Sequence, residues 1–142
     1  MRNLLHISEA TSLALHTMAL LTVRRDRRMT NTDIAQVLGA SVHTLAKVMN
    51  SLAHAGLVSA VRGPRGGFKL RREPGEIRLL DIYEAVEGPL GKPECLLSRP
   101  ICEGDTCILG GLIESVHNEV RVYLASKTLA ELAGEVKLRI PA

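Results

Sequence analysis

Residues 30–70 carry the pattern that most restricts the fold of this chain: two capped helices joined by a glycine turn and followed at once by a hairpin. Thr30 and Asp33 have the spacing of a capping box, and they predict a short helix over residues 34–38. Gly39 is the expected residue after that helix, because glycine readily adopts the left-handed backbone found there. Two helices joined in this way are typical of a helix-turn-helix.

The second helix of this pair is predicted from residue 42 to about residue 55, with Ser41 as its N-cap and Gly56 as its stop. Its apolar face comprises Val42, Leu45, Ala46, Met49, Leu52 and Ala53. Its polar face comprises His43, Thr44, Lys47, Asn50, Ser51 and His54. On an average helix such a polar face is merely solvated, but after a glycine turn it also fits a helix that enters the DNA major groove.

A hairpin follows the second helix. Residues 57–62 and 68–70 are predicted strands, and the turn between them reads Gly-Pro-Arg-Gly-Gly. A hairpin directly after a helix-turn-helix predicts a wing, although the same residues could form a hairpin and nothing more. The glycines allow the backbone to lie close to a phosphate, and Arg65 at the tip can reach into a minor groove. The basic residues of the wing are Arg62, Arg65, Lys69, Arg71 and Arg72.

The net charge of +3 hides an asymmetry between the two halves of the chain. Residues 1–75 hold 11 Lys/Arg against 4 Asp/Glu, a net charge of +7, and residues 76–142 hold 7 against 11, a net charge of −4. A basic half predicts a polyanionic partner. With two Tyr, one Phe and no Trp, the chain has few aromatic rings for stacking on single-stranded bases, so we expect duplex DNA. The arginine cluster at 24–28 is either an exposed loop or a second DNA contact.

We therefore divide the chain into a DNA-binding domain, residues 1–75, and a second unit, residues 76–142. The first six residues lack the apolar core of a signal peptide, and no apolar run is long enough to span a membrane. These features predict a cytoplasmic protein whose thiols stay reduced. Three cysteines are an odd number, which argues against a closed disulfide framework.

The second unit begins with a predicted helix that ends at Gly88 and continues into a loop, residues 88–107. This loop holds three prolines and all three cysteines, Cys95, Cys102 and Cys107. A loop of this length is usually functional or disordered. Because it is polar and rich in Pro and Gly, a packing role for the thiols is implausible.

Three soft thiolates on one loop suit an iron–sulfur cluster or zinc. Structural zinc favours C-x2-C pairs, which are absent here, so we favour a cluster of either the 2Fe–2S or the 4Fe–4S type. A fourth ligand is needed, and the candidates are Glu9, His16, His117 or a small exogenous molecule.

Beyond the loop, apolar residues recur at alternating steps of four and three, which predicts a helix over about residues 108–126. The positions are Leu109, Ile113, Val116, Val120 and Tyr123. Such a heptad seam is the pattern of two helices packed side by side. For so short a run an intrachain stripe is the commoner explanation, but a small chain most easily buries the seam against a second copy, which predicts a homodimer. Thr128 caps a last short helix. The predicted fold class is mainly α with a small β wing, a winged helix-turn-helix, plus a long C-terminal dimerisation helix.

On these residues the chain resembles the Rrf2 family of bacterial winged-helix regulators, over nearly its whole length. The resemblance is carried by the sequence LAHAGLV at 52–58, the wing VRGPRGGF at 61–68, the three-cysteine loop and TLAEL at 128–132. It implies a homodimer that crosses through the C-terminal helix, with one iron–sulfur cluster per subunit near the interface. It also implies a wing that reads the minor groove.

Within that family the chain is more similar to the nitric-oxide-responsive, NsrR-like members than to the IscR-like members. In IscR-like members a histidine three residues after the last cysteine completes the cluster, and that position here is Gly110. In NsrR-like members an acidic residue at the start of the first helix, from the partner subunit, can do so, and Glu9 matches it. The ligands implied by the resemblance are Cys95, Cys102, Cys107 and Glu9.

The predicted function is a DNA-binding transcriptional repressor that senses nitric oxide, redox or iron status and binds a palindromic operator. The predicted DNA contacts are Thr30, Ser41, His43, Thr44, Lys47, Arg62, Pro64, Arg65, Gly66 and Gly67. One alternative is a cluster-free switch with a Cys95–Cys102 or Cys102–Cys107 disulfide. Another is a regulator with a small molecule docked between helices. A thiol oxidoreductase lacks support, since the chain has no C-x-x-C, phosphate loop or Ser/His/Asp spacing, so we do not expect an enzyme.

Overall fold

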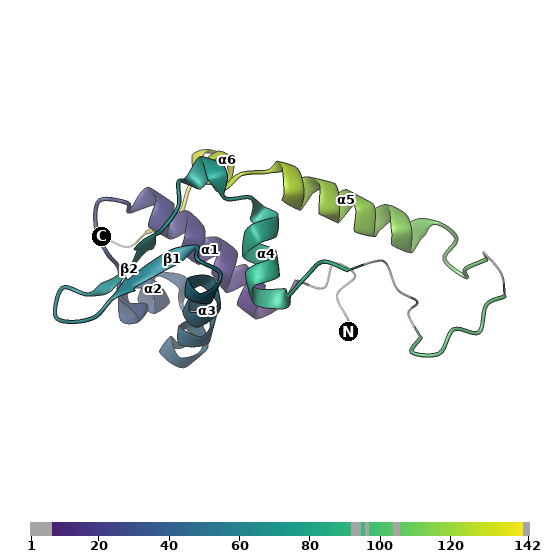
Figure 1. Ribbon diagram of the computed structural model, residues 1–142, viewed down its shortest axis with the longest axis horizontal. Helices are drawn as coiled ribbons and strands as arrows, with labels where there is room; N and C mark the ends of the chain where they lie inside the picture. The colour runs from purple at the N-terminus through teal and green to yellow at the C-terminus, as the bar shows by residue number, and fades with distance from the viewer. Residues whose placement is uncertain (1–6, 92–94, 96, 104–105, 141–142) are drawn as a thin grey trace.

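The computed structural model describes residues 7–91, 95, 97–103 and 106–140. It confirms the predicted fold class: helices dominate, and one antiparallel pair of strands forms the wing (Figure 1). In chain order the elements are α1 (Glu9–Val23), α2 (Asn31–Leu38), α3 (Val42–His54), β1 (Val58–Val61), β2 (Gly67–Leu70), the 3-10 turn η1 (Pro74–Glu76), α4 (Leu79–Glu87), α5 (Leu112–Ser126) and α6 (Leu129–Glu135).

The capping box at Thr30 is present in full. The Thr30 hydroxyl accepts from the Asp33 N–H at 3.1 Å, and the Asp33 carboxylate accepts from the Thr30 N–H at 3.0 Å. This backbone donor lowers the pKa of Asp33 below its ordinary value. Because Thr30 is the cap, α2 begins at Asn31, three residues before the predicted start. Gly39 ends it in the left-handed region, at φ +65°, as predicted.

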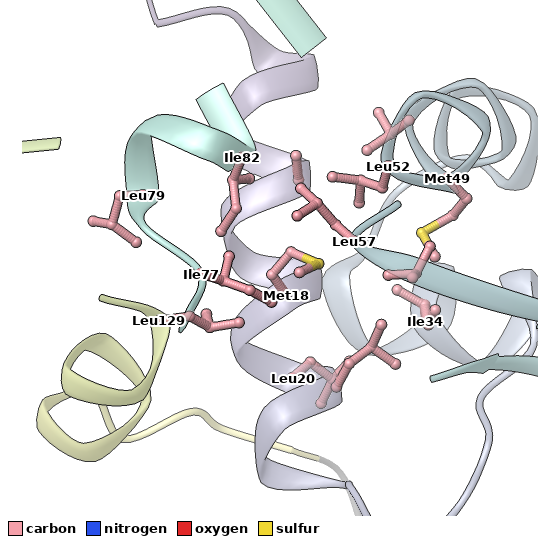
Figure 2. Close-up of a cluster of buried hydrophobic side chains, with 14 of the residues drawn as sticks. Met18, Leu20, Ile34, Met49, Leu52, Leu57, Ile77, Leu79, Ile82 and Leu129 are labelled. Carbon is pink, nitrogen blue, oxygen red and sulfur yellow. The ribbon is translucent and has the colours of Figure 1, made fainter. Parts of the chain in front are cut away.

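The hydrophobic core is built around α1. Met18 and Leu20 of α1 are fully buried, and Figure 2 shows them among side chains from α2, α3, α4 and α6. Ile82 and Leu129, from the second half of the chain, belong to the same buried cluster. One core therefore crosses the boundary between residues 75 and 76, and the division into two units stays a prediction about function.

The wing is attached to the segment between α1 and α2. Strands β1 and β2 pair antiparallel, with Val58 opposite Leu70 and Val61 opposite Gly67. Met29 extends this pairing: its N–H donates to the Phe68 carbonyl at 3.0 Å, and its carbonyl accepts from the Phe68 N–H at 2.7 Å. No local sequence signal predicts this bridge, because Met29 and Phe68 are far apart in the chain.

The predicted dimerisation helix starts later than expected. Helix α5 begins at Leu112, whereas the heptad pattern placed its start near residue 108. Residues 108–110 form a turn, with the Gly110 N–H donating to the Cys107 carbonyl at 2.8 Å. Gly110 lies at φ +60° and Gly111 is the N-cap, so two glycines interrupt the helix. The loop thus extends beyond residue 107, and Leu109 precedes the helix.

Helix α5 leaves one face partly open. Val116 and Val120 are half-buried, whereas Tyr123 is 52% exposed. With α1, α6 and residues 136–138, these side chains line a largely apolar groove of about 650 Å³. Over the described part of the chain, no helix is both long and apolar enough to cross a membrane.

Candidate nucleic-acid interface and cysteine loop

Helix α3 presents a polar face opposite its buried face. His43, Lys47, Asn50 and His54 are exposed. The buried residues are Leu45, Val48, Met49 and Leu52. The predicted apolar face is wrong at two positions: Val42, the first helical residue, is 44% exposed, and Val48 is buried. Val48 lies three residues after Leu45 and four before Leu52, so it shares their face.

The start of α3 is fixed by a local hydrogen-bond pair. The Ser41 hydroxyl accepts from the Thr44 N–H at 3.0 Å and donates to the Thr44 hydroxyl at 2.8 Å. Ser41, a predicted DNA contact, is therefore also the N-cap, and Thr44, another predicted contact, is its hydrogen-bond partner. The side chains of His43 and Lys47 have no partner among the described residues, so they are free to meet a ligand.

The basic residues of the wing fall into two groups. Arg62, Arg65 and Lys69 are exposed, and their side chains have no ion-pair partner among the described residues. Arg72, in contrast, donates to the Glu76 carbonyl at 2.9 Å, which ties the end of the wing to η1. Arg71, which follows the last residue of β2, is exposed as well and has no ion-pair partner among the described residues, so the free cations run from the tip of the wing to the end of β2.

Two wing glycines are required by the fold itself. A Cβ on Gly66 would lie 2.2 Å from the Val61 carbonyl oxygen. Gly67 lies at φ +130°, and a Cβ there would lie 2.7 Å from the Met29 carbonyl oxygen. Intramolecular packing alone thus explains these glycines, and their contact with DNA stays a prediction.

The arginine cluster at 24–28 lies at the base of the wing. Arg25 pairs with Glu73 at 3.1 Å, and both side chains are about half or more exposed, so the pair adds little stability. Arg27 and Arg28 are exposed. The cluster is therefore largely an exposed loop, and its contact with DNA stays a prediction.

The three cysteines are free and exposed. Glu9 is also exposed, in the first turn of α1. Within one chain, the described residues contain no group of three or more His, Cys, Asp or Glu that could hold a metal. His16, whose Nδ1 lies 2.6 Å from the Ser12 carbonyl oxygen, and His117, half-buried on α5, are not brought to the cysteines in such a group either.

The start of α1 and the start of the cysteine loop nevertheless lie at the same end of the molecule. The carboxylate of Glu87, the last residue of α4, accepts from the hydroxyls of Ser8 and of Thr11, the latter at 2.5 Å. From this point the chain enters the loop, which ends at the first turn of α5, away from the end of α4 (Figure 1). As a donor set, three free and exposed thiols on one loop fit a soft metal centre by their chemistry.

Two side chains, Arg121 and Glu84, contact the start of the loop, and neither contact is predicted from the sequence. Arg121 of α5 donates to the carbonyls of Leu90 and Gly91, each at 2.9 Å. The Glu84 carboxylate of α4 accepts from the Leu90 N–H at 3.0 Å. No sequence signal could have identified this pair, because its members lie 37 positions apart and their partners are backbone groups.

Comparison with known proteins gives a consistent result. A family model described as Rrf2, iron-dependent transcriptional regulator, matches residues 7–135. An HTH-type transcriptional regulator of Aquifex aeolicus is 33% identical over 128 residues, which cover 88% of this chain and 89% of that protein. The regulator IscR of Xenorhabdus nematophila is 32% identical over 100 residues, 70% of this chain and 61% of that protein. The matched part of the chain thus spans about three fifths of the length of IscR.

The solved structure of CymR, described as the global cysteine regulator of B. subtilis, superposes on this fold with a TM-score of 0.77. The two sequences are 30% identical, and the match covers 92% of this chain and 98% of that one. The family and the relatives compared are transcriptional regulators, with winged-helix DNA-binding architecture.

Proposed function

The chain belongs to the Rrf2 family of iron-dependent transcriptional regulators, and from that premise we propose that it is a repressor whose affinity for DNA depends on its cysteine loop. One observation carries the proposal: three free, exposed thiols lie on the segment between α4 and α5. Helix α4 packs against α3. A chemical change at those thiols acts on the connection between the DNA-binding surface and the predicted dimerisation helix.

The proposed DNA contacts combine α3 with the wing. His43 and Lys47, near the start of α3, face the major groove, and Arg62 and Arg65 reach the adjacent minor groove. Thr30, Ser41, Thr44, Pro64, Gly66 and Gly67 complete the proposed contact set. Positive charge on these elements supplies affinity through phosphate contacts.

We further propose that two copies bind together. The apolar groove beside α5 and the seam residues Val116, Val120 and Tyr123 would be covered by α5 of a second copy. A two-fold dimer places two α3 helices in successive major grooves, roughly 34 Å apart, and so requires a palindromic operator.

The family's description as iron-dependent supports an iron–sulfur cluster on the loop. Cys95, Cys102 and Cys107 would hold it, and Glu9 of the partner subunit would complete the set. When bound, such a group supplies a centre that reacts with nitric oxide or oxygen and that is lost when iron is scarce. The cysteines and Glu9 would hold the loop across the subunit interface. Among the described residues, the contacts between the loop and the helices lie at the start of the loop, at Leu90 and Gly91.

The cluster is tested by purification without oxygen. We expect a coloured protein that contains iron and sulfide and whose operator affinity falls about tenfold or more on addition of nitric oxide. Replacement of all three cysteines by serine is expected to abolish both the colour and the response to nitric oxide. A colourless protein without iron or sulfide, or an unchanged response in the serine variant, would contradict the cluster.

A second candidate is a thiol switch without a cluster. The exposure of all three thiols and the similarity to CymR, described as a cysteine regulator, favour it. Mild peroxide is then expected to produce a Cys95–Cys102 or Cys102–Cys107 disulfide, detected by mass spectrometry, together with a change in operator affinity. Oxidation without any change in affinity would rule out the switch.

The role of the wing is tested at Arg65. We expect Arg65→Ala to weaken binding to a selected operator about tenfold, and to lower the slope of log affinity against log salt by about one if the contact is to phosphate. Fluorescence anisotropy over a salt series measures both. Arg139→Ala, which removes an exposed arginine on the C-terminal tail, is the matched control. Equal losses in the two variants would remove Arg65 from the contact set.

A further inference from the structure

The base of the cysteine loop is held by a charged side chain from α5. The guanidinium of Arg121 is half-buried, and its Nη2 donates to the carbonyl oxygens of Leu90 and Gly91, each at 2.9 Å. Hydrogen bonds from a charged donor are stronger than neutral ones, and one nitrogen that bridges two successive carbonyls fixes the direction of the backbone.

The same short stretch is held from the other side by α4. The Glu84 carboxylate accepts from the Leu90 N–H at 3.0 Å, and the Leu90 side chain packs against the core. The donor and acceptor groups of the Leu90 backbone are therefore both engaged by side chains, one from each of two helices. We refer to Glu84, Arg121 and the Leu90–Gly91 backbone as the loop clamp.

The loop clamp lies a few residues before the first cysteine of the loop. Gly91 precedes Cys95 by four residues, so the Cα atoms of the two are within about 14 Å of each other. At its other end the loop enters α5 through the turn closed by Gly110 and Cys107. Arg121 is nine residues beyond Leu112, about 13 Å along the same helix. Helix α5 therefore holds both ends of the cysteine loop.

The loop clamp also reaches the DNA-binding helix. Helix α4 packs against both α3 and α5. Glu84 and Ala85 line a shallow pocket whose opposite wall is the C-terminal end of α3, formed by Asn50, Ser51, His54 and Ala55. A movement of the Leu90 backbone that displaces Glu84 thus acts next to the end of α3.

We propose that Arg121 and Glu84 are positioning residues that couple the cysteine loop to α3. The inference rests on the proposed function, in which the loop receives the signal. When the loop moves, the clamp passes the movement to α4 and to the end of α3. When Arg121 or Glu84 is replaced so that the loop clamp is lost, the thiols of the loop still react, but the movement no longer reaches the end of α3.

The first experiment compares operator affinity before and after alkylation of the thiols with iodoacetamide, using the full chain and a duplex selected by the wild type from a random library. If alkylation changes the affinity of the wild type about tenfold, we expect Arg121→Met to reduce that change to about twofold or less. Before alkylation, with its thiols free, the Arg121→Met variant should bind the operator with the affinity of the wild type. A full-sized change in Arg121→Met overturns the proposal.

Conservative variants separate positioning from folding. Arg121→Lys can still donate to one carbonyl, and we expect an intermediate change on alkylation. Glu84→Gln keeps an oxygen acceptor for the Leu90 N–H and should behave as the wild type, whereas Glu84→Ala should behave as Arg121→Met. Arg139→Met is the control for loss of an arginine. Identical behaviour of Glu84→Gln and Glu84→Ala would overturn the role of Glu84.

If alkylation leaves the operator affinity of the wild type unchanged, that result contradicts the proposed sensing function and not the loop clamp. Amide hydrogen exchange then still tests the loop clamp. We expect Arg121→Met to accelerate exchange about tenfold at Leu90 and also at residues 50–55, with no change in Arg139→Met. Faster exchange at Leu90 without any change at residues 50–55 would show a local anchor and overturn the coupling.

Discussion

Replacement of Gly67 by alanine is expected to lower the free energy of unfolding by about 2–4 kcal/mol. The residue lies at φ +130°, and a positive φ alone costs a residue with a Cβ roughly 1–2 kcal/mol. The added Cβ would also lie 2.7 Å from the Met29 carbonyl oxygen and 2.8 Å from the Met29 carbonyl carbon. Those atoms are backbone, so they cannot rotate away as a flexible side chain could.

The substitution also acts on the proposed DNA-binding surface. The Met29 carbonyl accepts from the Phe68 N–H, so a displaced Met29 weakens the bridge that holds the wing to the segment before α2. We therefore expect Gly67→Ala to weaken operator binding beyond the fraction of protein that it unfolds.

Two glycines provide matched controls for urea unfolding of the Gly67 variant. Gly63 lies at φ +109° and has open space where a Cβ would be added, so Gly63→Ala should show the cost of the backbone angle without the clash. Gly75 has open space and no positive φ, so Gly75→Ala should be nearly neutral. Equal losses in Gly63→Ala and Gly67→Ala would show that the contact with Met29 contributes nothing.

Replacement of Leu129 by alanine is expected to cost about 2–5 kcal/mol of unfolding free energy. The side chain is fully buried, and removing its methyl groups loses burial and leaves a cavity. Its backbone N–H donates to the Ile77 carbonyl at 2.8 Å, so the residue joins α6 to the segment before α4 (Figure 2).

The control for this variant is Leu112→Ala, at a site that is 50% exposed, where the loss should be well under half as large. Thermal and urea unfolding are compared at one protomer concentration, because association shifts apparent stability. Since Leu129 shares a core with α1, we expect a single transition in both variants. A separate, unchanged transition for residues 1–75 would show that the two units fold independently.

Much of the half that we propose to bind DNA could be predicted from sequence because its signals are local. The capping box at Thr30, the glycine at 39 and the hairpin turn each act within a few residues, and each is found where it was expected. The errors are also local. On α3 the buried residue is Val48, where Val42 was predicted, and α5 starts at Leu112, after Gly110 and Gly111, where a start near residue 108 was predicted.

The second half was less predictable because its contacts are long-range. The heptad spacing identified α5 but could not say which side chains would be buried, and in one chain Tyr123 stays half exposed. The three cysteines and Glu9 were chosen by residue type and by resemblance. The described residues of a single chain do not assemble them, so this ligand set stays a proposal.

The sequence by itself determined the local elements and the chemistry available: capped helices, a glycine-dependent wing, a positive half and three thiols on one loop. Backbone angles and caps depend on neighbours in the chain, so sequence suffices for them. Only the tertiary structure decided that Met29 bridges the wing, that one core joins both halves, and that Arg121 and Glu84 hold Leu90. Arg121 lies 31 positions from Leu90, and Glu84 lies 6 positions from it. Both side chains bind backbone groups of Leu90. Nearly every residue has the same backbone groups, so the sequence pattern cannot predict these contacts.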